Sequence, residues 1–394
     1  MKRLTSVALP VAGCLLALHL SRAATFNVLI PDEFNKVVDT NTVLVTNGYM
    51  NCWIEGPVWV PSGGGYLLFS AMDTSNKLMK LVPPHAISIS LSPPANTLYN
   101  GNLLDAQERL ISCEAGGAAL RVVMTTNGVA TPLCSTCAGL KFYSPNDLAI
   151  QSDGTIWFTD PGYNGGIGAP PQPGFQTNYY VYRFNPTNGN ATCLPVITSG
   201  ILKPNGICFS PDESLLYVAD SDTSRHRILV YSVSSSNTLS GGSVFATIPS
   251  GIPDGIKCDA DGRVYSSSAT GVQIYLPDGR LIGSILIPNT TPNLCFGDAD
   301  WKTLYIVAQP QVYSIRMKVA GEPSLKRIQI QASGTGQPMV CWPAPSTGFQ
   351  LESSPDLVTW TPVTDPLQVS NGLNNLTLDP TNPAAFYRLN KPVP

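Results

Sequence analysis

Residues 144–163 read SPNDLAIQSDGTIWFTDPGY, and this stretch decides the fold. A polar Asn146–Asp147 pair comes first, an Asp-Gly turn follows at 153–154, and an apolar run with Trp157 and Phe158 comes next. Turn residues ahead of an aromatic-rich run predict a short β-strand. The same arrangement recurs along the chain, and that recurrence predicts the architecture.

Six units of this kind occur, each a turn rich in Asp, Gly or Ser followed by an apolar run. In order they read PSGGGYLLFSA, DAQERLISCEA, SDGTIWFTDPG, SPDESLLYVAD, DADGRVYSSSA and DADWKTLYIVA. Their central apolar residues are Leu67, Leu110, Ile156, Leu216, Val264 and Leu304. Successive centres are 43, 46, 60, 48 and 40 residues apart, a period that suits a propeller blade of four short strands. We therefore expect an all-β chain with a six-bladed β-propeller, whose closure removes most free sheet edges.

The composition agrees with many short strands. Of 394 residues only 12% are charged, while 34 are glycine and 35 are proline. Such a mixture favours strands joined by tight turns, and the length allows one large domain plus a small one.

The N-terminal sequence MKRLTSVALPVAGCLLALHLSRAATF has two cationic residues, an apolar stretch and small residues before Ala23. It predicts a secretory signal peptide, residues 1–23, cleaved after Ala23, and hence an exported protein, periplasmic or extracellular. The alternative is a lipobox that ends at Cys14. Removing Lys2, Arg3 and Arg22 leaves 20 basic and 26 acidic residues, a net charge of −6. Such a chain is a poor candidate for nucleic-acid binding, and no later stretch reaches the ~20 apolar residues of a membrane span.

Two segments depart from the repeat. GYNGGIGAPPQPGFQTNYY, residues 162–180, lengthens the third interval and predicts an extended loop, either a lid over the mouth or a surface excursion. The repeats stop near residue 320, so the propeller is expected over 24–324. Residues 325–394, which contain GFQLESSPDLVTWTPV and AAFYRL, predict a small β module of unknown function. Its expected apolar anchors are Phe349, Leu351, Trp360, Phe386 and Leu389.

The cysteines form no compact framework. Nine of the ten remain after the predicted cleavage, and Cys134-Ser-Thr-Cys137 is a lone CxxC motif. Without a second pair, and with His85 and His226 as the only histidines left, zinc is not expected. Buried thiols or one local disulfide are the expected outcome.

Polar residues lie 10 to 12 positions ahead of five of the repeat centres. They are Glu55, Asn146, Asn205, Asp254 and Asn293. In a propeller the first strands of the blades surround a central channel, so these side chains are expected to converge on one axis. Crowded carboxylates repel, and a cation bound by oxygen ligands relieves that repulsion, with Ca²⁺ preferred and Mg²⁺ or Mn²⁺ possible. The alternative for each Asn-Gly, Asp-Gly or Pro-Asn pair is an ordinary turn.

The ordered set EGPVW, SPNDLAIQSDGTIWFTDPGY, PNGICFSPDESLLYVAD, PDGIKCDADGRVY and NLCFGDADWKTLYI resembles the SMP-30/gluconolactonase/LRE-like family over about residues 45–318. The resemblance implies a six-bladed propeller that holds a divalent metal in its channel and hydrolyses lactones. It implies Glu55, Asn205 and Asp254 as metal ligands and Asn146 as a contact to metal or substrate. We assign Asp254 as the general base, and Asp160 and Tyr163 as residues that line the substrate pocket.

Three positions depart from the family pattern: Ala71 stands where many relatives have Asp, Ala115 where several have His, and Ser144 where some have a substrate-gripping Arg. They leave the metal ligands intact but put a sugar-acid substrate in doubt. No GxSxG or HExxH motif offers another nucleophile or metal. Two further interpretations remain, a metal-dependent esterase or phosphotriesterase, and a non-catalytic propeller that binds a glycan or protein.

Overall fold

The computed structural model describes residues 21–72, 76–84, 86–92, 97–117, 119–163, 173–176, 178–323, 328–333, 336–344, 349–370, 373–379 and 386–390. His85 and most of the predicted lid, residues 164–172 and 177, lie outside this range. The regular secondary structure of the described chain is nearly all β-strand, with two short helices, α1 (Pro31–Val37) and α2 (Gly189–Thr192). None of the described helices has the length and apolar character that a membrane crossing requires.

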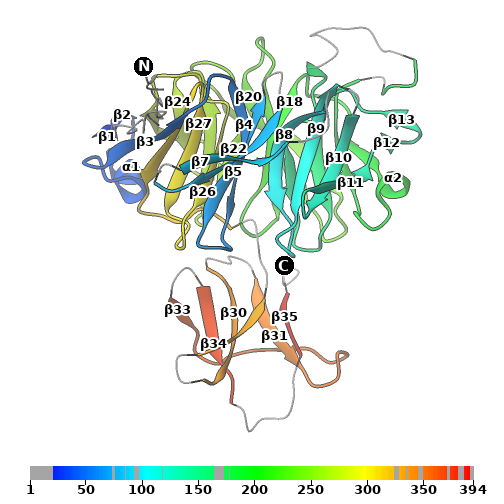
Figure 1. Cartoon of the computed structure of the whole chain (residues 1–394), viewed down its shortest axis with the longest axis vertical. Helices are drawn as coiled ribbons and strands as arrows, with labels where there is room; N and C mark the ends of the chain where they lie inside the picture. The colour runs from blue at the N-terminus through cyan, green and yellow to red at the C-terminus, as the bar shows by residue number, and fades with distance from the viewer. Residues whose placement is uncertain are drawn as a thin grey trace, which may run out of the picture.

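Six sheets of four or five strands follow one another in the described chain from residue 21 to residue 316 (Figure 1). The first contains β4 (Trp53–Val60), β5 (Tyr66–Met72), β6 (Lys77–Val82) and β7 (Ala86–Leu91). The second contains β8 (Thr97–Leu104), β9 (Leu110–Gly117), β10 (Ala119–Thr126) and β11 (Val129–Cys134). The third contains β14 (Leu148–Ile150), β15 (Ile156–Asp160), β16 (Tyr180–Phe184) and β17 (Leu194–Ile197).

The remaining three sheets complete the ring. The fourth contains β18 (Pro204–Phe209), β19 (Leu215–Asp220), β20 (Arg227–Val233) and β21 (Leu239–Thr247). The fifth contains β22 (Ile256–Cys258), β23 (Val264–Ser268), β24 (Gly271–Tyr275) and β25 (Leu281–Leu286). The sixth contains β26 (Asn293–Gly297), β27 (Thr303–Ala308) and β28 (Gln311–Arg316). A small hairpin of β12 (Thr136–Cys137) and β13 (Leu140–Lys141) lies between the second and third sheets in sequence.

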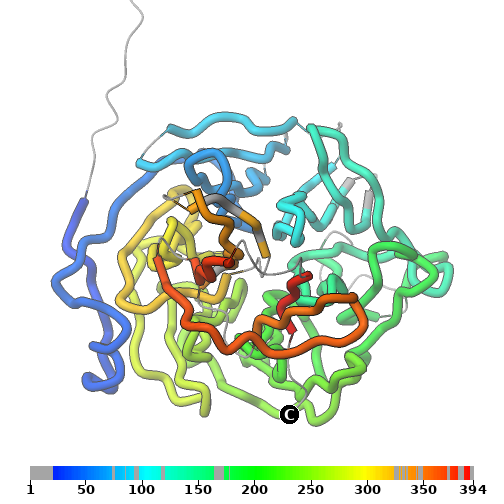
Figure 2. The backbone as a smooth tube through the Cα atoms, turned by 90° about the horizontal axis from the view of Figure 1, so that it is seen from below, coloured from blue at the N-terminus to red at the C-terminus, as the bar shows by residue number. Residues whose placement is uncertain are grey.

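The N-terminal segment closes the ring. Strand β3 (Val43–Tyr49) pairs antiparallel with β28, so one sheet joins the two ends of the repeat region. Strand β2 (Thr25–Val28) pairs with β25, and β1 (Ser21–Ala23), which precedes the predicted cleavage point, pairs with β3. Figure 2 shows the resulting ring from below. The N-terminal segment therefore covers an edge of the sixth sheet, through β3, and an edge of the fifth sheet, through β2.

The six repeat centres predicted from sequence all fall on the second strand of their sheets. They are Leu67 on β5, Leu110 on β9, Ile156 on β15, Leu216 on β19, Val264 on β23 and Leu304 on β27. Every one is buried between neighbouring sheets. The prediction of an all-β propeller is therefore confirmed.

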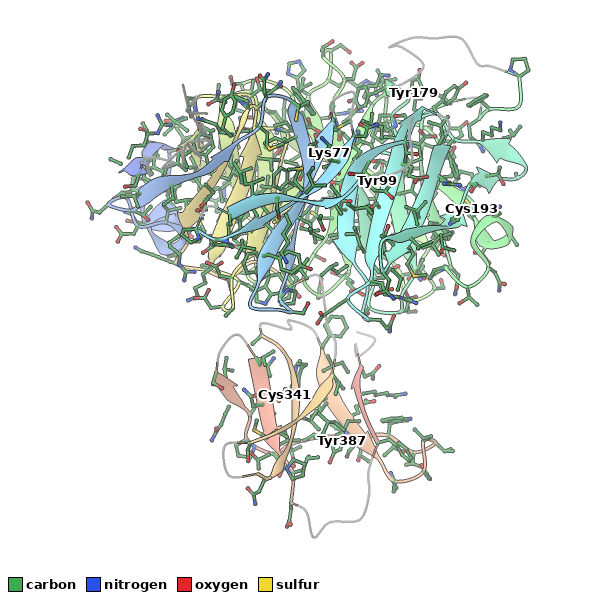
Figure 3. The ribbon with its side chains drawn as sticks, in the orientation of Figure 1. Lys77, Tyr99, Tyr179, Cys193, Cys341 and Tyr387 are labelled. Atoms are coloured by element: carbon green, nitrogen blue, oxygen red, sulfur yellow. The ribbon has the colours of Figure 1, made fainter. Side chains whose placement is uncertain are left out.

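The C-terminal residues form two further sheets, set below the ring in Figure 1. One contains β29 (Gln329–Ala332), β30 (Pro338–Pro343), β34 (Leu373–Thr377) and β33 (Gln368–Ser370). The other contains β32 (Thr361–Pro362), β31 (Gln350–Ser354) and β35 (Phe386–Asn390), and Cys341 and Tyr387 mark this unit in Figure 3. The division of the chain at about residue 324 stays a prediction.

The apolar anchors of this unit differ in part from those predicted. Leu351 is buried and Leu389 packs beside it, as expected, but Phe386 is 47% exposed. Successive side chains of a strand point to opposite faces, so Tyr387 and Leu389 of β35 face the core while Phe386 faces solvent. Val340 and Trp342 of β30 and Leu376 of β34 also belong to this core, and all three were missed.

Candidate active site at one end of the channel

Glycine allows the inner strands to approach one another around the channel. A Cβ atom on Gly56 would lie 2.1 Å from the backbone oxygen of Asn100, and one on Gly206 would lie 2.1 Å from that of Asp254. The Gly206 N–H donates to the same Asp254 oxygen at 3.1 Å, and the Gly101 N–H donates to the Asn146 oxygen at 2.8 Å. Because each glycine directly follows a polar residue, these contacts place the polar residues of neighbouring sheets side by side.

The third sheet uses a threonine instead, because Asp147 occupies the glycine position. Thr159 Oγ1 donates to the backbone oxygen of Asn205 at 2.7 Å, and the Thr159 carbonyl accepts from the Asn146 N–H at 2.8 Å. The Asp147 N–H donates to Thr159 Oγ1 at 3.2 Å. The buried hydroxyl thus joins the third sheet to the fourth.

Asn293 closes the circle. The Gly255 N–H donates to the Pro292 oxygen at 2.8 Å, which sets Asp254 beside Asn293. Asn293 Nδ2 donates to Glu55 Oε2 at 3.2 Å, and the Gly56 N–H donates to the same oxygen at 3.0 Å. The structure therefore brings all five polar residues singled out from sequence to one end of the channel.

Asn100 is a sixth member of this circle that the sequence interpretation missed. It is buried on β8, between Glu55 and Asn146 in the order of contacts, and Gly101 follows it. It lies 10 residues before Leu110, the same offset as Asn146 from Ile156. The Asn-Gly dipeptide at this offset was the signal that could have found it.

Two carboxyl groups in the circle are held in an unfavourable environment. Burial raises the pKa of Glu55 to about 7, against the hydrogen bonds that Gly56 and Asn293 donate to it. Burial also raises the pKa of Asp254 well above its usual value, and the charges of Glu55 and Asp147 add to this rise. Placing negative charge on both groups is costly unless a positive charge lies between them.

A second charged layer lies behind the circle. Asp147 is buried, and its Oδ2 lacks a hydrogen-bond partner among the residues described, its nearest cation being Lys257 Nζ at 3.6 Å. Burial alone would lower the pKa of Lys257, but Asp147 leads the interactions that outweigh it, so the net pKa is raised. The positive charge of Lys257 offsets the negative charge of one of three neighbouring carboxylates, Asp147, Glu55 and Asp254. Two of the three negative charges are left without a matching cation from Lys257.

The donor set fits a hard divalent cation. Glu55, Asp254 and the amide of Asn205 offer oxygen atoms, which Ca²⁺, Mg²⁺ and Mn²⁺ prefer. Among the described residues no group of three His, Cys, Asp or Glu side chains is placed to hold a metal. A cation at this end of the channel therefore depends on amide oxygen as well as carboxylate, and that is the set inferred from sequence.

Tyr163 lies over the circle. Its hydroxyl accepts from Asn205 Nδ2 at 3.2 Å, and burial, with Asp254 next in importance, raises its pKa. Lys203 holds the preceding turn, since Nζ donates to the Pro161 oxygen at 3.0 Å and lies 4.1 Å from the ring centre of Tyr179. Tyr179 is labelled on the upper face in Figure 3.

Asp160 has a different environment. It is fully buried, and its two carboxylate oxygens accept from the backbone N–H groups of Tyr143 and Ser144. These bonds order the turn that leads to Asn146. Burial raises the pKa of Asp160 to about 7.

Two of the departures from the family pattern are neighbours. Ser144 Oγ donates to the backbone oxygen of Ala115 at 3.0 Å, and both residues are buried. Ala71, the third, is buried on β5.

His226 lies in the turn before β20, where its carbonyl accepts from the Ile248 N–H at 2.8 Å.

A cavity of about 510 Å³ opens at the other end of the channel. Its walls come from the parts of the inner strands that follow the polar circle, such as Trp59, Leu148, Cys208 and Phe296. It contains none of Glu55, Asn146, Asn205 and Asp254. The cavity is therefore separate from the candidate active site.

Fold and site together define a propeller whose channel gathers acidic and amide oxygens at one end. The sequence profile of the SMP-30/Gluconolactonase/LRE-like region matches residues 53–309, and the chain belongs to this family.

The relatives agree with this assignment. A gluconolactonase from Zymomonas mobilis is 32% identical over 311 residues, 73% of this chain and 85% of the relative. Lactonohydrolase oryL from Aspergillus oryzae is 28% identical, over 69% of each chain. The solved structure of a gluconolactonase from Xanthomonas campestris has a TM-score of 0.66 at 29% identity, covering 76% of this chain and 99% of that one.

Proposed function

We propose that this chain is a lactone hydrolase that depends on a divalent cation held by Glu55, Asn205 and Asp254. The observation that carries the proposal is the circle of buried oxygens, in a chain whose relatives are named gluconolactonase and lactonohydrolase. A bound cation, Ca²⁺ most favourably, supplies Lewis-acid polarisation of the lactone carbonyl.

Asp254 is proposed as the general base. Burial raises the pKa of its carboxyl group, and the charges of Glu55 and Asp147 add to this rise, which strengthens the carboxylate as a proton acceptor. It takes a proton from water as the water oxygen bonds to the lactone carbonyl carbon. When the ring C–O bond breaks, the proton passes to the leaving alkoxide, and the product is a hydroxy acid. Such a base contributes roughly 10²–10⁴ in rate.

Asn146 and Tyr163 are proposed to position the substrate. Hydrogen bonds fix both backbone groups of Asn146, its N–H to Thr159 and its carbonyl to Gly101. The side chain therefore extends from a fixed position of the backbone. An amide N–H held there donates to the oxyanion that develops as water adds. The Tyr163 hydroxyl, which already accepts from Asn205, has its own proton to donate to a substrate oxygen.

Asp160 is proposed to act through the backbone. Its predicted contact with substrate stays a prediction, while its two bonds to the 143–144 backbone support a positioning role for the turn before Asn146. Loss of these bonds would leave two buried N–H groups unpaired, which costs about 1–3 kcal/mol each.

A pH-indicator assay across lactones, aryl esters and a phosphotriester, with and without a chelator, tests the proposal. Acid release from lactones that stops with chelator and returns with Ca²⁺ is expected. Turnover of esters or the phosphotriester alone would shift the assignment to those bonds. A folded protein that binds Ca²⁺ but turns over none of the panel would identify a binding propeller instead.

A further inference from the structure

Two thiols meet where the fourth and fifth sheets pack together. Cys208 lies on β18 and Cys258 ends β22, and their sulfur atoms are 3.8 Å apart. Both residues are buried, in an apolar cluster that includes Tyr217, Ile256 and Tyr275. Fifty residues separate them in sequence, so only the folded ring brings them into contact.

The close approach of the two strands explains this contact. At Gly206 the backbone of β18 lies against that of Asp254, where no Cβ atom could fit. Cys208 lies two residues further along β18 and Cys258 four residues beyond Asp254, a short distance at the rise of about 3.3 Å per strand residue. The glycine contact thus holds the two strands near enough for the thiols to touch.

The thiols are also within reach of small molecules. Both line the cavity of about 510 Å³ at the end of the channel opposite the candidate active site. Cys295 and Lys257 line the same cavity. A small disulfide reagent that enters the cavity therefore meets Cys208 and Cys258 without unfolding of the ring.

We propose that Cys208 and Cys258 are a redox-active pair that becomes a disulfide between adjacent blades. The oxidant is a second disulfide, R–S–S–R, which reacts by thiol–disulfide exchange. One cysteine thiolate attacks it and forms a mixed disulfide with release of R–S⁻; the other then attacks the protein-side sulfur and releases the second R–S⁻. The two cysteine protons end on two R–SH molecules, and the two electrons reduce the oxidant. The sulfur atoms need to close by about 2 Å to reach a normal bond length.

The bond would act on the candidate active site through the backbone. β18 carries Asn205 and the turn before β22 carries Asp254, both proposed cation ligands. A covalent link three to four residues further along fixes the spacing of these two strands. The disulfide itself does not depend on the proposed function, because its formation is measured without substrate.

Another cluster of thiols offers a rival pairing. Cys134, Cys137 and Cys193 lie together, and Cys193 is labelled at the outer edge of the ring in Figure 3. There the Cys137 thiol donates to the Cys193 carbonyl at 3.2 Å, and the Cys193 side chain also hydrogen-bonds with the side chains of Cys134 and Cys137. Unlike Cys208 and Cys258, these three residues do not line the cavity of about 510 Å³. Cys134, Cys137, Cys193, Cys208 and Cys258 are all free thiols in the structure.

Peptide mapping of the full chain tests the proposal. The reduced protein is incubated with oxidised glutathione at pH 8.5 for several hours, because a hydrogen bond to Cys208 and burial raise the pKa of Cys258 and slow exchange. Free thiols are then blocked, and the protein is digested without reductant. Loss of two blockable thiols and a linked Cys208–Cys258 peptide are expected, with a rise in melting temperature of about 5 °C.

Matched variants complete the experiment. Cys295→Ser, in the same cavity, should still form the link, whereas Cys208→Ser and Cys258→Ser should each abolish it together with the rise in melting temperature. If Cys208 and Cys258 are both recovered blocked from oxidised wild-type protein, or if the only links join Cys134, Cys137 and Cys193, the proposal is overturned. The peptide map of the wild-type protein decides the outcome, so the test remains valid even if a serine variant fails to fold.

Discussion

Replacing Glu55 with Gln should stabilise the cation-free protein above neutral pH. The pKa of Glu55 is about 7, against an ordinary value of 4.5, mainly because the carboxyl is buried. A pKa difference of one corresponds to about 1.36 kcal/mol, so ionising Glu55 in the folded chain costs about 3 kcal/mol. Gln keeps an oxygen acceptor for the Gly56 N–H and for Asn293, so the variant loses the charge and little else.

The sign of the pH dependence follows from linkage. The folded chain binds the Glu55 proton more tightly than the unfolded chain does, so the protonated carboxyl favours folding fully below pH 4.5. This contribution is lost as the pH rises through about 7. The Glu55→Gln variant cannot ionise at this position, so it keeps this contribution to stability at every pH. The stability difference between variant and wild type should therefore be near zero at pH 4.5 and about 3 kcal/mol at pH 8.

Urea unfolding in the presence of a chelator measures this difference at pH 4.5, 6 and 8. Glu33→Gln, which removes a surface carboxylate paired with Lys36 at 2.8 Å, is the matched control and should change stability by at most about 1 kcal/mol. Added Ca²⁺ should raise the stability of wild type at pH 8 much more than that of the Glu55→Gln variant. The reasoning fails if the variant is no more stable than wild type at pH 8, or if its gain is equal at pH 4.5.

Three further changes probe the site and the chain's division. Asp254→Asn should keep the fold by circular dichroism and weaken Ca²⁺ binding, and kcat for a lactone should fall by roughly 10²–10⁴; unchanged turnover would remove its role as base. Gly206→Ala should displace the Asp254 backbone, 2.1 Å from the new Cβ, and lower stability by about 1–3 kcal/mol with loss of Ca²⁺ affinity in a titration. Deleting residues 325–394 should leave turnover of soluble lactones intact, and its loss in a folded truncated protein would count against a boundary near 324.

The ring could be predicted from sequence alone because a single repeat period places both the core residues of the blades and the polar residues of the candidate site. Leu67 and Ile156 mark second strands, and Glu55 and Asn146 precede them by nearly the same offset, so one repeat fixes both positions. Asn100 obeyed this rule and was still missed, although the centre of its repeat, Leu110, was found. A glycine follows Glu55, Asn100, Asn205 and Asp254, and it was the more informative mark.

Other features depend on contacts that no pattern encodes. The register of β35 decides that Leu389 faces the core and Phe386 faces solvent, and one residue of slip would reverse them. The bonds from Asp160 to the 143–144 backbone link residues on separate segments. The meeting of Cys208 with Cys258 likewise depends on how two sheets pack, which spacing along the chain does not reveal.

The central claim is that acidic and amide side chains from separate blades hold one cation, and anomalous diffraction from crystals soaked in Mn²⁺ tests it most directly. The account predicts one strong peak in the channel, with oxygen atoms of Glu55, Asn205 and Asp254 at about 2.0–2.6 Å. A peak elsewhere in the chain, with these three side chains bound only to one another or to water, would contradict it.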